Sequence, residues 1–245
     1  MSLKIRENYS PNFDPRIRKR KDIRFIIIHY TGMKSEKKAI QRLTKIQSEV
    51  GVHYFVKKDG DIIRMVPDLY KAWHAGISNW GKYKLLNKHS IGIELSNPGH
   101  QFGYINFSKK QIKNLIKLAS ILIKKYKIKK NYILGHSDIA PNRKRDPGEK
   151  FPWKTLYKKK IGIWHNLNGK KLILLRRKNV SITETDLFFN KLKKFGYFFK
   201  KTNVKDRNKY NKLLIKSFQR RFRPELISGK IDQECLIILK KLANT

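Results

Sequence analysis

One stretch, residues 135–148 (GHSDIAPNRKRDPG), concentrates the side chains of this chain that could do chemistry. It holds a histidine, His136, two carboxylates, Asp138 and Asp146, and three adjacent cations. Its glycines and prolines predict a loop that leaves a short strand over 131–134 and contains no helix. Imidazole and carboxylate are zinc ligands, but a catalytic zinc site needs three protein ligands and a position for water. The stretch therefore predicts part of a metal site that needs another ligand from elsewhere.

His29 is the outstanding candidate for the missing nitrogen ligand. It ends the apolar run Ile23–Ile28, which predicts a strand buried on both faces because its apolar residues do not alternate with polar ones. Open α/β sheets place their ligands at such strand ends. A histidine considered alone in this position is more often a hydrogen-bonded core residue. The residues by themselves also leave Asp138 and Asp146 as rivals for the carboxylate ligand.

Glu94 is a further candidate because it lies inside the apolar strand predicted over Ile91–Ser96. A carboxylate in such a strand is seldom there without a partner. It could form a salt bridge, or it could serve as the general base that hydrolysis of an amide needs. The sequence alone leaves both alternatives open.

Five motifs follow one another in an order that resembles a known family. They are FIIIHYT (25–31), VHYFVKKDG (52–60), AWHAG (72–76), IGIELSNPG (91–99) and GHSDIAPNRKRDPG (135–148). Together, over about residues 23–155, they resemble the zinc-dependent N-acetylmuramoyl-L-alanine amidases of the type 2 amidase, or peptidoglycan-recognition, fold. Any one motif is weak, but five in register are specific.

The resemblance implies a role for each candidate residue. It assigns one Zn²⁺ per chain to His29, His136 and Asp146, the carboxylate that precedes Pro-Gly. It makes Glu94 the catalytic general base, and it makes Lys144 the cation that stabilises the oxyanion. The tyrosine that some relatives use is replaced here by Val52, so Glu94 has no such rival. The implied substrate-binding residues are Tyr30, Trp73, His74 and Arg143. His74 could instead orient its neighbours, and Trp73, like Trp80, could instead cap the core.

The predicted elements give an α/β fold with a mixed central sheet flanked by helices, because strands and helices alternate up to residue 160. The clearest helix spans 108–126, with an apolar stripe and a capping box of Ser108 and Gln111. An Asp-Gly turn predicts a hairpin of residues 53–57 and 61–66. Shorter helices are expected over 35–48 and 153–159.

After residue 160 the pattern changes to a small helical domain. Strand-like pieces at 161–164 and 172–175 precede helices expected at about 183–195, 211–222 and 232–242. The segment 218–242 resembles the peptidoglycan-binding domain that follows some of these amidases. We therefore expect a tail that binds wall polymer and adds no chemistry. The predicted divisions are an extended segment (1–22), a zinc amidase catalytic domain (23–160), a linker (161–180) and a helical peptidoglycan-binding-like domain (181–245).

Composition limits the classes of protein to which this chain could belong. The net charge of +40 invites a nucleic-acid interpretation, but no nucleic-acid-binding motif accompanies it, so we expect only nonspecific, salt-sensitive adhesion to polyanions. No run of 18 apolar residues predicts a membrane span. The single cysteine, Cys235, lies in an amphipathic helix and is expected in the core. A monomer is expected. The N-terminus lacks a signal peptide, which predicts a cytoplasmic protein, with the periplasm or cell envelope as the alternative.

The resemblance implies hydrolysis of the amide between N-acetylmuramic acid, or its anhydro form, and L-alanine of the stem peptide. Peptidoglycan or muropeptides are the expected partners, in wall turnover or recycling. The alternative is a non-catalytic peptidoglycan-recognition protein on the same fold. Because all three ligand positions and Glu94 are filled, the sequence favours the enzyme.

Overall fold

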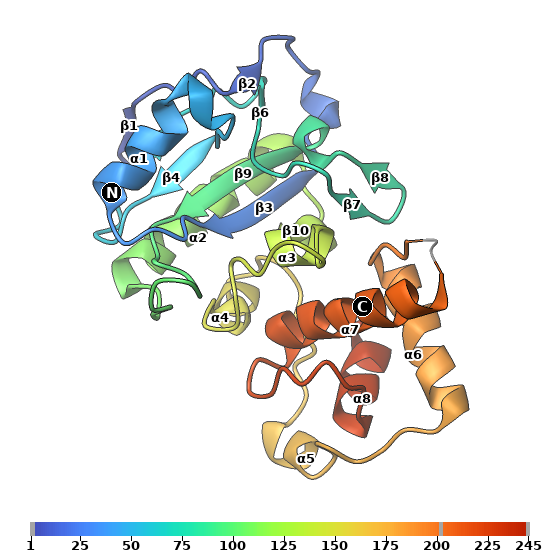
Figure 1. Ribbon diagram of the computed structural model, residues 1–245. Coiled ribbons are helices and arrows are strands. Elements are labelled where there is room, and N and C mark those ends of the chain that lie inside the picture. Colours follow the sequence, from blue (N-terminus) through green and yellow to red (C-terminus); the bar gives the residue numbers. More distant parts are fainter. Residues whose placement is uncertain (1–2, 201–202, 244–245) are drawn as a thin grey trace.

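A mixed sheet with helices on both faces forms the main layer of the protein (Figure 1). The computed structural model describes residues 3–200 and 203–243, and within them this sheet has the strand order β1-β5-β4-β9-β3-β10. β4, β9, β3 and β10 run parallel, whereas β5 pairs antiparallel with β4. The strands are β1 (Ile5–Glu7), β3 (Phe25–Tyr30), β4 (Tyr54–Val56), β5 (Ile62–Arg64), β9 (Ser90–Leu95) and β10 (Ile133–Gly135). The predicted α/β class with a mixed sheet is confirmed.

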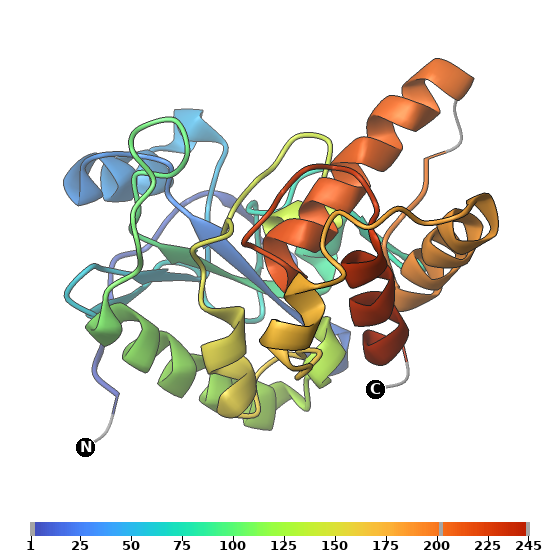
Figure 2. The ribbon, with the colours of Figure 1, turned by 90° about the horizontal axis from the view of Figure 1, so that it is seen from below.

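Successive side chains of β4 pack into two different apolar layers, one on each face of the sheet. Tyr54 and Val56 pack in the larger core with α2 (Lys109–Tyr126), while Phe55 packs in a second cluster with α1 (Glu36–Thr44). Figure 2 shows the sheet between these two helices. Successive side chains of a strand point to opposite faces, so one strand supplies both layers.

The start of α2 corrects one detail of the prediction. The Ser108 side chain accepts the Gln111 backbone N–H, as expected for an N-cap. The Gln111 side chain does not complete a capping box; it donates to the carbonyls of Val56 and Ser96 instead. These bonds tie the helix to the strand ends, which is a tertiary contact that the local pattern does not contain.

The N-terminal segment is more than an extended lead-in. β1 adds a parallel edge strand to β5, and β2 (Phe13–Asp14) pairs antiparallel with β6 (Lys71–Ala72). Between them the buried Asn12 amide donates to three main-chain carbonyls, among them that of Val50 at 2.9 Å. The segment therefore closes one side of the sheet.

The remaining short elements lie in the connections. Two of them, β7 and β8, form a hairpin. The bounds are η1 (Arg20–Asp22), η2 (Ile46–Ser48), β7 (Asn79–Trp80), β8 (Tyr83–Lys84), η3 (Leu86–Lys88), η4 (Lys130–Tyr132), α3 (His136–Ile139) and α4 (Trp153–Lys158).

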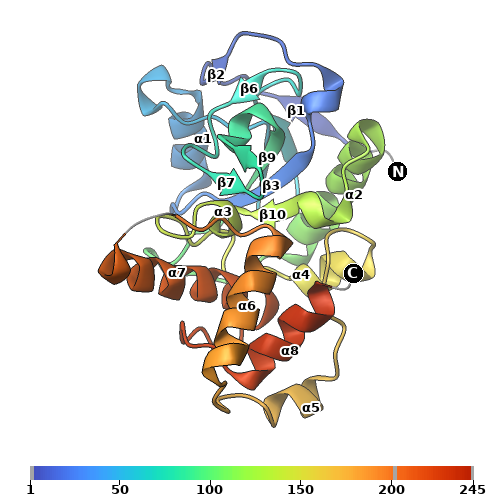
Figure 3. The same ribbon diagram turned by 90° about the vertical axis from the view of Figure 1, so that its right-hand side faces the viewer.

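The C-terminal helices pack against the sheet domain and share its core (Figure 3). They are α5 (Gly169–Ile173), α6 (Ile182–Phe195), α7 (Val204–Phe222) and α8 (Gln233–Leu242). The three helices expected after residue 180 are present, but both strand-like pieces before them are wrong: residues 161–164 form no strand, and 172–175 overlap α5. Short apolar runs do not distinguish strand from helix by periodicity.

Several residues of the C-terminal region lie deep in this shared core. Phe188, Phe218 and Cys235 are fully buried, as expected for the cysteine. The segment predicted as a linker buries Ile161 and Trp164 in the same cluster. No helix in residues 3–200 and 203–243 has both the length and the apolar character needed to cross a membrane. Positions 1–2, 201–202 and 244–245 of the predicted divisions lie outside the described residues.

Candidate functional site

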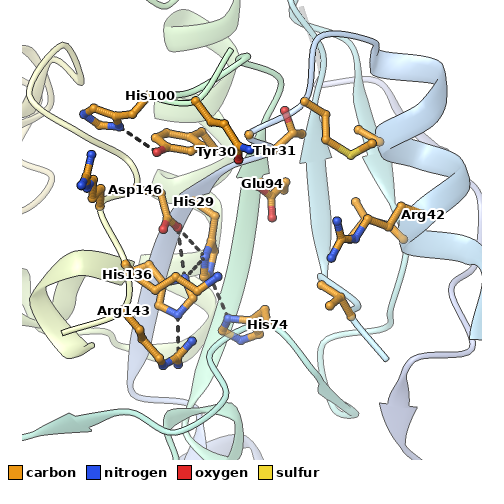
Figure 4. Close-up of a pocket in the computed structure, with 18 residues that line it drawn as sticks. His29, Tyr30, Thr31, Arg42, His74, Glu94, His100, His136, Arg143 and Asp146 are labelled. Carbon is orange, nitrogen blue, oxygen red and sulfur yellow. Dashed lines mark hydrogen bonds and ion pairs between the residues drawn. The ribbon is translucent and has the colours of Figure 1, made fainter. Parts of the chain in front are cut away.

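The candidate site lies at the carboxyl edge of the parallel strands. His29 of β3 pairs in register with Glu94 of β9, and Ile28 pairs with Gly135 of β10. His136 follows Gly135 directly, so the chain places it beside His29. Figure 4 shows these side chains converging with Asp146 from the following loop. The sheet register therefore assembles residues that are far apart in the sequence.

Three buried ligand atoms meet at this edge, as the sequence predicted for His29, His136 and Asp146. The two Nδ1 atoms of His29 and His136 are 3.0 Å apart, and each lies 3.1 Å from Oδ2 of Asp146. His136 opens the short helix α3 (His136–Ile139), which corrects the expectation of a loop without helix. Gly135 precedes the first turn, and its N–H donates to Asp138, so the glycine does not break the helix.

A chain of hydrogen bonds behind His29 fixes which of its nitrogens is free. The Ser90 hydroxyl donates to Leu86 O at 2.6 Å, so its oxygen accepts from Nε2 of His74 at 3.1 Å. Because burial holds the pKa of His74 well below its usual value, His74 is neutral and its Nδ1 accepts from Nε2 of His29 at 3.0 Å. Nδ1 of His29 then carries a lone pair directed at the cluster.

The other two members of the cluster present lone pairs as well. Nε2 of His136 lies 3.2 Å from the carbonyl of Ala75, which can only accept, and this contact is shorter than the 3.4 Å to Nη2 of Arg143; Nε2 therefore carries the proton of the neutral ring and Nδ1 does not. Burial lowers the pKa of His29 to about 4. Burial alone would raise the pKa of Asp146, but contacts with both histidines outweigh it and hold that pKa below its usual value. Three acceptor atoms about 3 Å apart repel one another unless a cation lies between them, so the cluster fits a divalent metal such as zinc.

The alternating face of β9 explains why His74 fits behind His29. Ser90, Gly92 and Glu94 point to one face of the sheet. A Cβ on Gly92 would lie 2.5 Å from the imidazole of His74, so only glycine admits the ring. His74 therefore orients His29, the alternative role left open by the sequence, although it also reaches the pocket lining.

Glu94 has the environment of a reactive carboxylate. It is 9% exposed, and no hydrogen bond or ion pair joins its carboxylate to another of the residues described. Burial, with a contribution from Asp146, raises its pKa to about 8, while Lys144 and Arg42 act in the opposite direction. A strand salt bridge, the alternative from sequence, is absent within the described part of the chain. Buried carboxylates with raised pKa values are typical of catalytic acids and bases.

The cluster opens into a pocket of about 630 Å³. Tyr30, His74, Arg143 and Lys144 line it, together with Glu94 and the three ligand candidates. The Arg143 guanidinium donates to the carbonyls of Ala75 and Ile77, which orders the loop beside the site. This volume and its mixture of charges suit a polar ligand of moderate size.

Two tryptophans from the sequence analysis lie elsewhere. Trp73 is 36% exposed and is not among the residues that line the pocket, so its substrate role stays a prediction without support from this geometry. Trp80 is buried and packs its ring 4.9 Å from that of Tyr197. Of its two proposed roles, the structure supports the core.

Several residues that line the pocket had no predicted role, among them Arg42 and His100. Arg42 reaches the pocket from α1, and His100 links Tyr30 to Glu149 with hydrogen bonds of 2.8 and 2.9 Å. Arg42 carried no local signal among so many cations. His100 follows the Asn-Pro-Gly turn after β9, and its place at a strand end could have marked it.

Asp138, the rival carboxylate, serves a different purpose. Its buried side chain accepts from Nη1 of Arg221 at 2.6 Å, from the hydroxyl of Tyr197 at 2.7 Å and from Gly135 N–H at 2.8 Å. Arg221 also donates to Ile133 O, and Ser217 donates to the carbonyl of residue 137. The C-terminal helices thus hold the turn that begins with His136.

Comparisons with known proteins agree with this geometry. Residues 19–149 match the family model described as N-acetylmuramoyl-L-alanine amidase. The amidase AmiD of Escherichia coli K12 is 35% identical over 232 residues, covering 90% of this chain and 82% of AmiD. The 1,6-anhydro-N-acetylmuramyl-L-alanine amidase AmpD of Haemophilus influenzae is 34% identical over 60% of this chain and 88% of AmpD.

Solved structures extend the similarity through the C-terminal helices. E. coli AmiD in complex with anhydro-N-acetylmuramic acid-L-Ala-D-γ-Glu-L-Lys superposes with a TM-score of 0.78 at 33% identity, covering 91% of this chain and 89% of AmiD. AmpDh3 of Pseudomonas aeruginosa superposes with a TM-score of 0.77 at 29% identity, covering 94% and 93% of the two chains. With its sequence, fold and buried cluster in agreement, this chain belongs to the N-acetylmuramoyl-L-alanine amidase family.

Proposed function

We propose that this protein is a zinc-dependent amidase that cleaves the bond between N-acetylmuramic acid, or its anhydro form, and L-alanine of the stem peptide. The observation that carries the chemistry is the trio of buried lone pairs on His29, His136 and Asp146, beside the unpaired carboxylate of Glu94. The substrate class is supported by the relatives, since AmiD and AmpDh3 were solved with anhydromuramyl peptides.

In the proposed mechanism the metal would activate the reactants, and neighbouring residues fix the tautomers of its two histidine ligands. Zinc held by the three ligands would supply Lewis-acid activation of water and of the scissile carbonyl. His74 and Ser90 keep His29 in the tautomer that leaves its Nδ1 free for the metal. Ala75 O does the same for His136 through its Nε2–H.

Glu94 and Lys144 complete the proposed mechanism. The Glu94 carboxylate takes the proton of the attacking water and returns it to the leaving amine, which requires a pKa near the working pH. Lys144 lines the same pocket and places a positive charge where the carbonyl oxygen becomes an oxyanion. The raised pKa of Glu94 makes it able to hold the proton between the two transfers.

A direct test incubates the zinc-loaded protein with an anhydro-N-acetylmuramyl tripeptide and follows products by mass spectrometry. Release of the free tripeptide, with L-alanine at its amino end, is expected. Intact substrate with wild-type protein, together with measurable binding, would favour the non-catalytic recognition protein instead.

For the C-terminal helices we propose a contribution to binding of wall polymer, on the resemblance of residues 218–242 to peptidoglycan-binding domains. Glu94→Gln protein is expected to cosediment with sacculi at roughly 0.5 M salt, where exposed charges are screened within a few ångströms. Complete release by salt would reduce the binding to nonspecific attraction by the +40 charge.

A further inference from the structure

A second hollow lies beside the active-site pocket, between the loop at 141–145 and helix α7. Its volume is about 370 Å³. Arg143, Lys144 and Arg145 line both spaces, so the two hollows share a wall. Figure 3 shows α7 running alongside the α3 region that carries this loop. The second hollow is therefore adjacent to the active-site pocket.

The second hollow is lined by cations from two parts of the chain. The loop supplies three, and α7 supplies Lys216 and Arg220, which lie four residues apart and so on one face of the helix. No acidic side chain is among the described residues that line it. Positive charge is therefore concentrated at this hollow, whereas the positive charge of the chain as a whole is dispersed.

The guanidinium of Arg220 makes few hydrogen bonds or ion pairs with the residues described. Its side chain is 11% exposed, and its buried Nε has no hydrogen-bond partner among the residues described. The nearest carboxylate, Glu149, lies 3.9 Å away and already accepts from His100 at 2.9 Å. Burial, with the nearby charge of Arg145, lowers the pKa of Arg220. A guanidinium in this position is stabilised by an added anion.

From this juxtaposition we propose that the hollow is a subsite for a free carboxylate of the stem peptide, bound chiefly by Arg220 with Lys216 and Arg145. The assignment rests on the proposed function. A glutamate linked through its γ-carboxyl, as in the peptide solved with AmiD, keeps its α-carboxylate free one residue beyond L-alanine. That group is the first anion past the scissile bond, and it could reach a hollow that shares a wall with the pocket.

The test compares two substrates that differ only in this carboxylate: anhydro-N-acetylmuramyl-L-Ala-γ-D-Glu-L-Lys and the same peptide with the α-carboxylate amidated. For wild-type enzyme, amidation is expected to raise KM about tenfold, the loss of about one charge-assisted contact. Arg220→Gln should raise KM for the acid by a similar factor and leave KM for the amide unchanged. Lys216→Gln should show the same selectivity to a smaller degree, because an ammonium lacks the bidentate fork with which arginine binds a carboxylate.

Controls separate this inference from the proposed function. Lys209→Gln removes one exposed charge from the same helix and should leave both KM values unchanged. Zinc content and thermal midpoint show whether each variant is folded. If the wild type cleaves both substrates with one KM, the subsite is wrong although the amidase activity stands; if it cleaves neither, the proposed function itself fails.

Two further outcomes would also overturn the assignment to a peptide carboxylate. One is an equal rise of KM for acid and amide in Arg220→Gln, which would indicate a structural role. The other is equal inhibition with both substrates by inorganic phosphate at constant ionic strength, abolished by Arg220→Gln. That result would make the hollow a phosphate site that the stem peptide does not occupy.

Discussion

Replacing Arg221 by methionine tests whether the C-terminal helices hold the metal-binding turn. Asp138, whose side chain is 1% exposed, would lose its 2.6 Å bond from Arg221 and keep only Tyr197 and Gly135. Removing one partner of a buried ion pair costs about 3–5 kcal/mol, because the other charge stays buried. The loss of the bond to Ile133 O adds to this cost. Since a domain is typically stable by about 5–15 kcal/mol, the variant should fold but be markedly weakened.

A double variant tests whether the unpaired charge of Asp138 causes the loss of stability in Arg221→Met. Arg221→Met with Asp138→Asn removes both charges and keeps an acceptor for Tyr197, so it should recover at least about 1 kcal/mol relative to Arg221→Met alone. Arg207→Met, on an exposed turn of the same helix, is the matched control and should change stability by no more than about 0.5 kcal/mol.

The assay is urea unfolding of metal-free protein followed by circular dichroism, since bound metal would add its own stabilisation. Zinc affinity is then measured by competition with a chelator, and it should fall about 10- to 100-fold in Arg221→Met because the turn carrying His136 is loosened. Unchanged midpoint and unchanged zinc affinity would refute the idea that α7 supports the site.

Four other predictions follow from the same geometry. Elemental analysis should find about one zinc per chain, and a chelator should abolish hydrolysis; full activity without metal would contradict the ligand set. Glu94→Gln should keep zinc and lose roughly 10²-fold or more in kcat, whereas a wild-type kcat would remove Glu94 from the mechanism. Because Glu94 must be ionised to accept a proton, kcat/KM should fall as the pH drops through the pKa of Glu94. Arg42 lowers that pKa, so Arg42→Gln should move the acidic limb of the pH profile to higher pH. An acidic limb that stays in place or moves to lower pH would exclude Glu94 as its origin. Truncation at Lys178 should impair zinc binding as well as solubility, since it removes Tyr197, Ser217 and Arg221; retention of soluble-substrate activity within a few-fold would restore the picture of a separable tail.

The sequence predicted which ligand candidates lie together, because short motifs place them at the same edge of the sheet. His29, His136 and Asp146 sit at strand ends or in one loop, so parallel pairing was enough to bring them together. Glu94 stood out because a carboxylate interrupts an apolar strand. For His29 and Glu94 the signal was a polar side chain in a place that burial normally forbids, whereas Asp146 was preferred to Asp138 only by the family resemblance.

The sequence could not show interactions that depend on packing between distant elements. Nothing near Asp138 indicates that Arg221 and Tyr197 complete it, since the three are brought together by the docking of α6 and α7. Arg42 and Arg220 were hidden among many cations, and only the folded chain shows that they face the two hollows. The role of His74 was ambiguous because its place behind His29 requires the absent side chain of Gly92.

Two adjacent faces of α7 contact the site in different ways. Ser217 and Arg221 point at the turn that begins with His136, while Lys216 and Arg220 point at the hollow beside the pocket. A domain that served only to tether the enzyme to a polymer would need neither set of contacts. If α7 holds the turn that begins with His136, loosening the Asp138–Arg221 pair should lower zinc affinity. If α7 also binds the peptide beyond the scissile bond, neutralising Arg220 should change KM without changing zinc content. The two variants lie one residue apart on the same helix, so opposite patterns in the same pair of assays would separate support of the metal from recognition of the substrate.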